Sequence, residues 1–461
     1  MALHRVNRQT AASSTITYAT EFPGRTLPKL TIPEDSLAPA VARALVQDEL
    51  ILDGNSRQNL ATFCTTWVAP EVRDLMAECI DKNMIDKDEY PQTAEIESRC
   101  VHMLADLWHS PQAAATIGCS TTGSSEAAML GGLAMKWRWK QRRSAAGAST
   151  ERPNLVCGPV QVCWKKFAKY FEVELREVPL RANGVGMHPD DVAPRCDERT
   201  IGVVATLGVT FTCAYEPVKE IATALDALQA QKGLDVPLHV DGASGAFVAP
   251  FIQPQLEWDF RIERVKSINA SGHKYGLAPL GVGWVIWRDA RELPEDLVFR
   301  VDYLGGDMPT FALNFSRPAG EIIAQYYNLI RYGREGYRRI QQSCADSAQY
   351  LAAEIGAMGP FEVLYDGRDG LPAIAYTLRD PRQSPFSLYD LSDRVRMRGW
   401  QIASYPLPPD REETVVQRVL VRQGVSRDMV SLLAEDIRRA VSQLASQGRS
   451  PSNEPRPSFH H

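Results

Sequence analysis

The sequence lacks a long apolar run, an apolar leader and an excess of basic residues, and each absence excludes a class of protein. No stretch approaches the roughly eighteen consecutive apolar residues of a transmembrane helix. Residues 1–20 are polar and lack the apolar core of a secretory signal, so none is expected. The net charge of −5, without a dominant basic cluster, predicts no nucleic-acid partner and no membrane partner.

The nine cysteines form no metal-binding or disulfide motif. They are odd in number, scattered along the chain and without paired CxxC spacing. No metal site is therefore predicted, and reduced thiols in a cytoplasmic protein are the simplest interpretation.

A chain of 461 residues exceeds one compact core, and shifts in composition divide it into four parts. We expect an N-terminal arm and helix over 1–57, a large domain over 58–344, a small domain over 345–447 and a flexible tail over 448–461.

Strand-like runs alternate with helical patterns in the large domain. The runs span 154–160, 201–207, 238–243, 265–270 and 282–287. This alternation predicts an α/β fold with a mostly parallel sheet covered by helices on both faces. Helical patterns at 345–358 and 429–447, with strand patterns at 373–378 and 415–421, predict a small α+β domain.

The segment Ser271-Gly272-His273-Lys274-Tyr275-Gly276 carries the strongest functional signal. It places a lysine on a glycine-flanked turn after a buried strand, where partial burial and a cationic neighbour favour the neutral amine of a Schiff-base lysine. Asp241 ends an earlier strand and suits a partner for a pyridinium nitrogen, with Ala243 as the floor beneath a flat ring. Together these residues predict a pyridoxal phosphate site. Two alternatives are that Asp241 only caps the next helix and that His273 is a core histidine.

A candidate phosphate site lies at Gly123-Ser124-Ser125-Glu126, which opens a helical run over 127–143. Glycine permits close approach of the backbone, and the helix N-terminus with two hydroxyls favours an anion. The alternative is a plain helix cap with Ser125 as the capping residue.

Several long segments resemble the glutamate decarboxylase family of bacteria, plants and fungi. They span 53–67, 86–91, 123–132, 154–164, 239–251, 267–289, 301–306 and 314–320, and the similarity runs from about residue 45 to about residue 445. The run SGHKYGLAPLG is the most specific of them. The resemblance implies the aspartate-aminotransferase type of pyridoxal phosphate enzyme (fold type I), which acts as a homodimer or hexamer with its active site at the dimer interface.

The same resemblance implies the site residues. Lys274 is similar to the lysine that holds the coenzyme, and Tyr303 to a catalytic residue on a mobile lid. The remaining coenzyme contacts would be Ser124, Ser125, Gln161, Thr210, Asp241, Ala243, His273 and, from a neighbouring subunit, Ser316. The substrate contacts would be Thr62, Phe63, Asn83 and Asp86 at the distal carboxylate and Arg418 at the α-carboxylate. Gly242 replaces the alanine usual in the family.

The activity implied is α-decarboxylation of L-glutamate to γ-aminobutyrate and carbon dioxide. Alternatives are the same scaffold acting on another acidic amino acid such as aspartate or cysteine sulfinate, a different pyridoxal phosphate reaction, or a non-catalytic assembly partner. The lysine, aspartate and serine pair argue against the last. The C-terminus lacks the basic, tryptophan-bearing segment of plant members, so no calmodulin partner is expected.

Overall fold

A computed structural model describes residues 29–182, 184–301 and 308–447, and the chain divides into two compact units between Gln58 and Asn59. In the first unit, helix α1 (Pro39–Leu50) starts with a proline, which suits this position because the first N–H groups of a helix have no helical acceptor. It lies within the N-terminal arm and helix expected over 1–57.

The second unit contains a seven-stranded sheet in the order β1-β7-β6-β5-β4-β2-β3. The strands are β1 (Ile117–Thr121), β2 (Asn154–Cys157), β3 (Glu174–Glu177), β4 (Thr200–Thr206), β5 (Leu238–Asp241), β6 (Val265–Ala270) and β7 (Gly283–Trp287). Strands β3, β2, β4, β5 and β6 are parallel, whereas β7 is antiparallel to both β6 and β1. The predicted mostly parallel sheet is confirmed.

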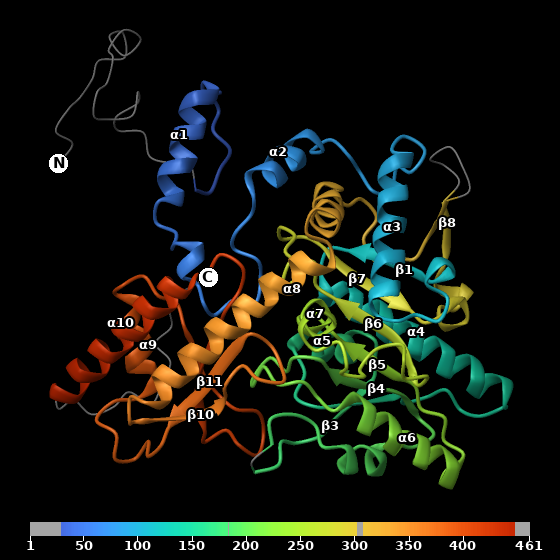
Figure 1. The fold of residues 1–461 in the computed structure, drawn as a ribbon. Helices are drawn as coiled ribbons and strands as arrows, with labels where there is room; N and C mark the ends of the chain where they lie inside the picture. Colours follow the sequence, from blue (N-terminus) through green and yellow to red (C-terminus); the bar gives the residue numbers. More distant parts are fainter. Residues whose placement is uncertain (1–28, 183, 302–307, 448–461) are drawn as a thin grey trace. The chain divides into compact units, whose positions relative to one another are not determined.

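Helices cover both faces of this sheet (Figure 1). They are α3 (Pro91–Leu107) and α6 (Val218–Lys232) on one face, and α4 (Ser124–Ala145) and α5 (Val162–Tyr170) on the other. Successive side chains of a strand point to opposite faces, so Val156 packs with the α3 and α6 side whereas Leu155 and Cys157 pack with α4 and α5. Strands buried on both faces read as continuous apolar runs, which made them predictable.

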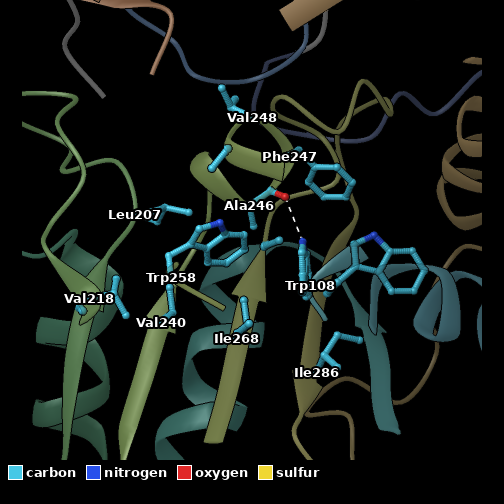
Figure 2. Close-up of a cluster of buried hydrophobic side chains, with 14 of the residues drawn as sticks. Trp108, Leu207, Val218, Val240, Ala246, Phe247, Val248, Trp258, Ile268 and Ile286 are labelled. Atoms are coloured by element: carbon cyan, nitrogen blue, oxygen red, sulfur yellow. Dashed lines mark hydrogen bonds between the residues drawn. The ribbon is translucent and has the colours of Figure 1, made fainter. Parts of the chain in front are cut away.

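A cluster of large side chains fills the core beside the carboxyl end of β5 (Figure 2). Trp108 lies at its centre, with edge-on contacts to Phe247 and Trp258. Its indole Nε1 donates a 3.0 Å hydrogen bond to the carbonyl oxygen of Ala246, which satisfies the polar end of a fully buried ring. The cluster thereby fixes the segment that follows Asp241.

A four-stranded antiparallel sheet lies in the C-terminal part of the chain, in the order β10-β11-β13-β12. Its strands are β10 (Phe361–Tyr365), β11 (Ala373–Leu378), β12 (Ala403–Pro406) and β13 (Val415–Leu420), and it packs with α9 (Leu388–Arg396) and α10 (Arg427–Ser446). A two-stranded ribbon joins β8 (Phe299–Val301) to β9 (Met308–Thr310). Short helices α2 (Pro70–Glu78) and α7 (Ala249–Ile252) also belong to the second unit.

Helix α8 (Gly320–Gly356) contributes to the cores of both sheets. It is interrupted at Gly333, whose φ of +54° is tolerated by glycine. The helix predicted at 345–358 is the C-terminal part of α8, so the expected boundary between the large and small domains falls within a helix and stays a prediction. No described helix is long and apolar enough to cross a bilayer.

Candidate active site

A cavity of about 270 Å³ lies where the carboxyl ends of β4, β5 and β6 meet the N-terminus of α4. Crevices at this edge of an open α/β sheet are the usual ligand sites of such folds. Nine of the predicted site residues line it: Phe63, Ser124, Ser125, Gln161, Thr210, Asp241, Ala243, His273 and Lys274. Segments separated by up to 211 residues in sequence (63 to 274) therefore converge on one cavity.

Lys274 enters this cavity from the turn after β6. Its Nζ lies 5.2 Å from the centroid of the Phe63 ring, and no described residue accepts a hydrogen bond from it. Burial lowers the pKa of Lys274, and the nearby Asp241 carboxylate only partly offsets this. The neutral, nucleophilic amine is favoured as a result.

The turn that carries Lys274 is held by buried side chains of α8. Four of them donate hydrogen bonds of 2.8–2.9 Å to the carbonyl oxygens of residues 275–277: Gln325, Asn328, Tyr337 and Gln341. The Thr65 hydroxyl donates to the carbonyl oxygen of Lys274 itself at 2.6 Å. The lysine backbone is thereby fixed while its amine faces the cavity.

Asp241 receives three donors at the base of the cavity. Trp164 Nε1 donates to Oδ2 at 2.8 Å, whereas Asn269 Nδ2 and the Ala243 N–H donate to Oδ1 at 3.0 and 3.1 Å. The Ala243 contact is a local turn, and it is not the helix cap of the alternative interpretation, because Ser244 is the N-cap of the next helix, Gly245–Phe247. The two side-chain donors are not part of that turn, and they orient the carboxylate toward the cavity it lines.

Helix α4 starts at Ser124, and its N-cap is Gly123 without a side-chain capping bond. The alternative in which Ser125 is only a helix cap is wrong. A Cβ on Gly123 would lie 3.0 Å from Cε1 of His273, so the imidazole packs directly on this loop. The predicted phosphate loop and the His273 ring thus form one surface.

His273 is a neutral imidazole with a defined tautomer. Burial, and then the charge of Lys274, lowers its pKa to about 4. Its Nδ1 accepts a hydrogen bond of 3.3 Å from the Gly281 N–H, so Nε2 carries the proton and can donate it to a ligand.

Arg418, on β13, lies beside the cavity. Its Nη1 donates to the carbonyl oxygen of Thr210 and its Nη2 to that of Ala61, the latter at 2.9 Å. The guanidinium carbon lies 4.4 Å from the centroid of the Phe63 ring, which thus contacts both Arg418 and Lys274. The buried Nε of Arg418 has no hydrogen-bond partner among the described residues.

Four other predicted residues do not line this cavity. The Thr62 Oγ1 accepts a hydrogen bond from the Cys64 N–H at 3.1 Å. Asn83 Nδ2 donates to Ser316 Oγ at 3.3 Å, and Asp86 lies near this pair because its N–H donates to the Asn83 carbonyl. Tyr303 lies outside the described residues.

Comparison with known proteins identifies the family to which this chain belongs. A model of the pyridoxal-dependent decarboxylase conserved domain matches residues 33–379. The glutamate decarboxylase of Aliivibrio fischeri is 63% identical over 419 residues, which cover 91% of this chain and 90% of that protein. The chain belongs to the glutamate decarboxylase family. Its coenzyme is pyridoxal phosphate.

Two further comparisons place the chain and its fold within this family. Glutamate decarboxylase beta of Listeria innocua is 46% identical over 423 residues, with 91% of each chain covered. The solved glutamate decarboxylase of Lactobacillus brevis is also 46% identical, with a TM-score of 0.88 over 91% of this chain and 96% of that one. The expected fold type I, the aspartate-aminotransferase type, is confirmed.

The cavity of this decarboxylase fits its coenzyme chemically. The N-terminus of α4 and the neutral His273 offer N–H donors to a phosphate. Two buried hydroxyls that line the cavity, Ser271 Oγ and Thr206 Oγ1, have no partner in the part of the chain that the structure describes. Such groups need a hydrogen-bonding ligand or water to offset their desolvation.

Sequence reasoning missed two residues that organise this decarboxylase site. Trp164 and Asn269 both donate to Asp241, and both are fully buried. Trp164 resembles any core residue of an amphipathic helix. Asn269 had a detectable signal, because it is a polar residue inside a strand that is otherwise buried on both faces.

Proposed function

We propose that this chain catalyses the α-decarboxylation of L-glutamate to γ-aminobutyrate and carbon dioxide. The names of the relatives support the substrate. The observation that carries the proposal is the convergence of Lys274, Asp241, Ser124 and His273 on one cavity, with Arg418 at its side.

The residues that line the cavity would hold the coenzyme. We assign the phosphate to Ser124, Ser125 and His273, which line the cavity at the start of α4, where the His273 ring packs on Gly123. Asp241 takes the pyridine nitrogen and Lys274 the aldehyde carbon. The remaining contacts are assigned to Ala243 and Gln161 on the two ring faces and Thr210 at the ring hydroxyl.

Arg418 is assigned to the substrate α-carboxylate. When bound, the coenzyme draws electrons from the bonds at the substrate Cα. Arg418 is held by two carbonyl oxygens and the Phe63 ring, so its guanidinium has little freedom to move. A fixed cation at this place orients the bond between Cα and the carboxylate, which determines the bond that breaks. Lys274 or Tyr303 then supplies the proton that Cα requires.

We further propose that a second copy of the chain completes each active site. Asn83, Asp86 and Ser316 do not line the cavity of their own chain, although Asn83 and Ser316 are hydrogen-bonded to each other. In a homodimer, Asn83, Asp86 and Ser316 of one copy would enter the cavity of the other copy. Asn83 and Asp86 would then reach the distal carboxylate of the substrate, and Ser316 would reach the phosphate of the coenzyme. All nine cysteines are free thiols, which supports a reducing compartment, and we place the enzyme in the cytoplasm.

The substrate assignment is tested by carbon dioxide release from L-glutamate, L-aspartate, L-cysteine sulfinate and L-glutamine. We expect glutamate to give the highest kcat/KM and to exceed glutamine by about 10⁴-fold, because buried groups that bind the distal carboxylate are left unpaired by the amide. Turnover of aspartate or glutamine without turnover of glutamate would refute the assignment. Failure of borohydride to bleach the purified protein would favour a non-catalytic homologue instead.

A further inference from the structure

A continuous chain of buried polar side chains runs beneath the cavity. Ser267 Oγ lies 2.7 Å from His239 Nδ1, and His239 Nε2 lies 2.7 Å from Asn269 Oδ1. Asn269 Nδ2 then reaches both Asp241 Oδ1, at 3.0 Å, and Ser124 Oγ, at 2.6 Å. Ser267, His239 and Asn269 are each at most 1% exposed. Ser267 and His239 do not line the cavity, and Asn269 contacts it only through the side chains to which it donates.

The direction of every hydrogen bond in this chain follows from its last member. Both carboxylate oxygens of Asp241 accept from N–H donors, so the amide group facing Asp241 is the NH₂ of Asn269. The Asn269 carbonyl oxygen therefore faces His239, whose Nε2 must carry the proton. Burial lowers the pKa of His239, which keeps the ring neutral, so Nδ1 accepts from the Ser267 hydroxyl.

The His239 ring is tightly packed between α4 and Trp164, and its two hydrogen bonds fix which way round it lies. A Cβ on Gly131 of α4 would lie 2.6 Å from His239 Cε1, so the imidazole packs against the helix backbone. Its other side meets the Trp164 indole at a centroid distance of 5.2 Å. An imidazole turned over about its Cβ–Cγ bond would fill the same space but present Cδ2 to Ser267 and Cε1 to Asn269, so both hydrogen bonds would be lost. Ser267 and His239 together therefore set the orientation of the Asn269 amide.

This polarity has a consequence at Ser124. Its Oγ accepts from Asn269, so its own hydroxyl proton remains available for an anion at the start of α4. At Asp241, Oδ1 is occupied by Asn269 and the Ala243 N–H, whereas Oδ2 holds the Trp164 indole and retains capacity toward the cavity. One amide thus prepares both ends of the coenzyme site.

We propose that Asn269 is a positioning residue that couples the phosphate end and the ring end of the coenzyme site, with its orientation set by His239 and Ser267. Asn269 acts through Ser124 and Asp241, so this inference rests on the coenzyme contacts proposed for those two residues.

The test compares Asn269→Leu with Asn154→Leu. Leucine keeps the approximate shape of asparagine and removes its hydrogen bonds. Asn154, the first residue of β2, is an equally buried asparagine that also donates to an aspartate, Asp197, and accepts from a hydroxyl, Thr200. It lies at the other end of the strands and does not line the cavity. If coenzyme affinity falls merely because a buried asparagine has been removed, it will fall in both variants.

Three probes are titrated into each apoenzyme: pyridoxal phosphate, phosphate-free pyridoxal, and inorganic phosphate in competition with pyridoxal phosphate. We expect Asn269→Leu to raise the Kd for pyridoxal phosphate about 10- to 100-fold and to weaken both part-probes. Asn154→Leu should stay within about twofold of the wild type. The coupling role would be overturned if Asn269→Leu and Asn154→Leu bound pyridoxal phosphate equally well. It would also be overturned if Asn269→Leu weakened the binding of only one of pyridoxal and inorganic phosphate.

Ser267→Ala keeps the test decisive if Asn269→Leu does not fold. It removes only the outermost donor, and we expect a rise of about threefold to tenfold in the Kd for pyridoxal phosphate. An unchanged Kd in this variant overturns the assigned polarity. A wild-type apoenzyme that binds none of the three probes would instead refute the proposed coenzyme contacts, which distinguishes the two failures.

Discussion

At the scale of single residues, the site lowers the pKa of its basic groups, which favours their neutral forms. Burial lowers the pKa of both Lys274 and His273, and their proximity lowers that of His273 further. A neutral amine can attack a carbonyl carbon, and a neutral imidazole with a protonated Nε2 can donate to a phosphate. Arg418 remains the cation available for a carboxylate, so charge is placed where the substrate needs it.

The first prediction concerns Lys274. We expect Lys274→Ala to lose the borohydride-stable link to the coenzyme and about a thousandfold or more of turnover. Coenzyme should still bind, because Asp241, Ser124 and His273 are unchanged. Peptide mass analysis after borohydride treatment checks the link, with Lys266→Ala on β6 as a control that keeps it. A link that persists in Lys274→Ala would exclude this lysine as its site.

A second prediction concerns Glu216, a buried carboxyl that accepts from the backbone N–H groups of Met187 and Thr206, each at 2.7 Å. Burial raises its pKa from 4.5 to about 7, against the effect of those two donors. The folded protein therefore binds this proton more tightly than the unfolded chain does. The stabilisation is complete below pH 4.5 and is lost as pH rises through about 7.

We expect Glu216→Gln to lack this pH-dependent stabilisation. Between pH 4.5 and 7.5 the wild type should lose up to about 3 kcal/mol more unfolding free energy than the variant does. Thermal midpoints across this range measure the difference, and Glu362→Gln, at an exposed position of β10, is the control. Parallel pH profiles for the wild type and Glu216→Gln would show that the carboxyl is ionised throughout.

At the scale of elements, the site depends on strand ends held in register. Thr206 of β4 pairs with Asp241 of β5, and Asp241 pairs with Asn269 of β6. Three polar residues thus stand side by side at the carboxyl edge, and the turns after each strand complete the cavity. The α8 amides fix one of these turns, and the cluster around Trp108 fixes another.

The third prediction tests how tightly two of these strand ends pack. Gly242 stands where the family resemblance leads one to expect alanine. A Cβ added at this position would lie 2.7 Å from Ala246 Cβ and 3.1 Å from the Asn269 carbonyl oxygen. We expect Gly242→Ala to cost about 1–3 kcal/mol of stability and to weaken coenzyme binding, because Asp241 and Ala243 must shift. Thermal midpoint and coenzyme Kd measure this. Gly356→Ala in α8, which meets only ordinary contacts, should be tolerated.

The same elements show what sequence could predict and what it could not. Strand 265–270 was predicted with its observed ends, because the β-branched Val265 and Ile268 stand shortly before the glycine-flanked turn that begins at Ser271. Strand β3 was missed because it is a polar edge strand with the sequence ELRE. The role of Asn269 depends on the register of β6 against β5, and no local pattern encodes the register of parallel strands.

At the scale of the molecule, one chain accounts for only part of the predicted site. The residues predicted from the lysine, aspartate and serine motifs meet in one cavity, whereas Asn83, Asp86 and Ser316 remain outside it. A sequence pattern identifies a residue type and its role, but it does not say which copy of the chain supplies it. A symmetric dimer makes both sets compatible, because each copy can then give what the other lacks.

This division between chains yields the last prediction, which is a complementation experiment. One variant carries Lys274→Ala, and the other carries Asn83→Ala with Ser316→Ala. Each alone should be nearly inactive. In a hybrid dimer the second variant supplies an intact cavity and the first supplies intact Asn83 and Ser316, so random mixing should restore roughly a quarter of wild-type turnover.

The control is co-expression of Lys274→Ala with Asp241→Ala. This pair should restore nothing, because both residues line the same cavity and every hybrid site keeps one defect. If the first pair also restores nothing while hybrid dimers are present, Asn83 and Ser316 act within their own chain and the cavity must close around them.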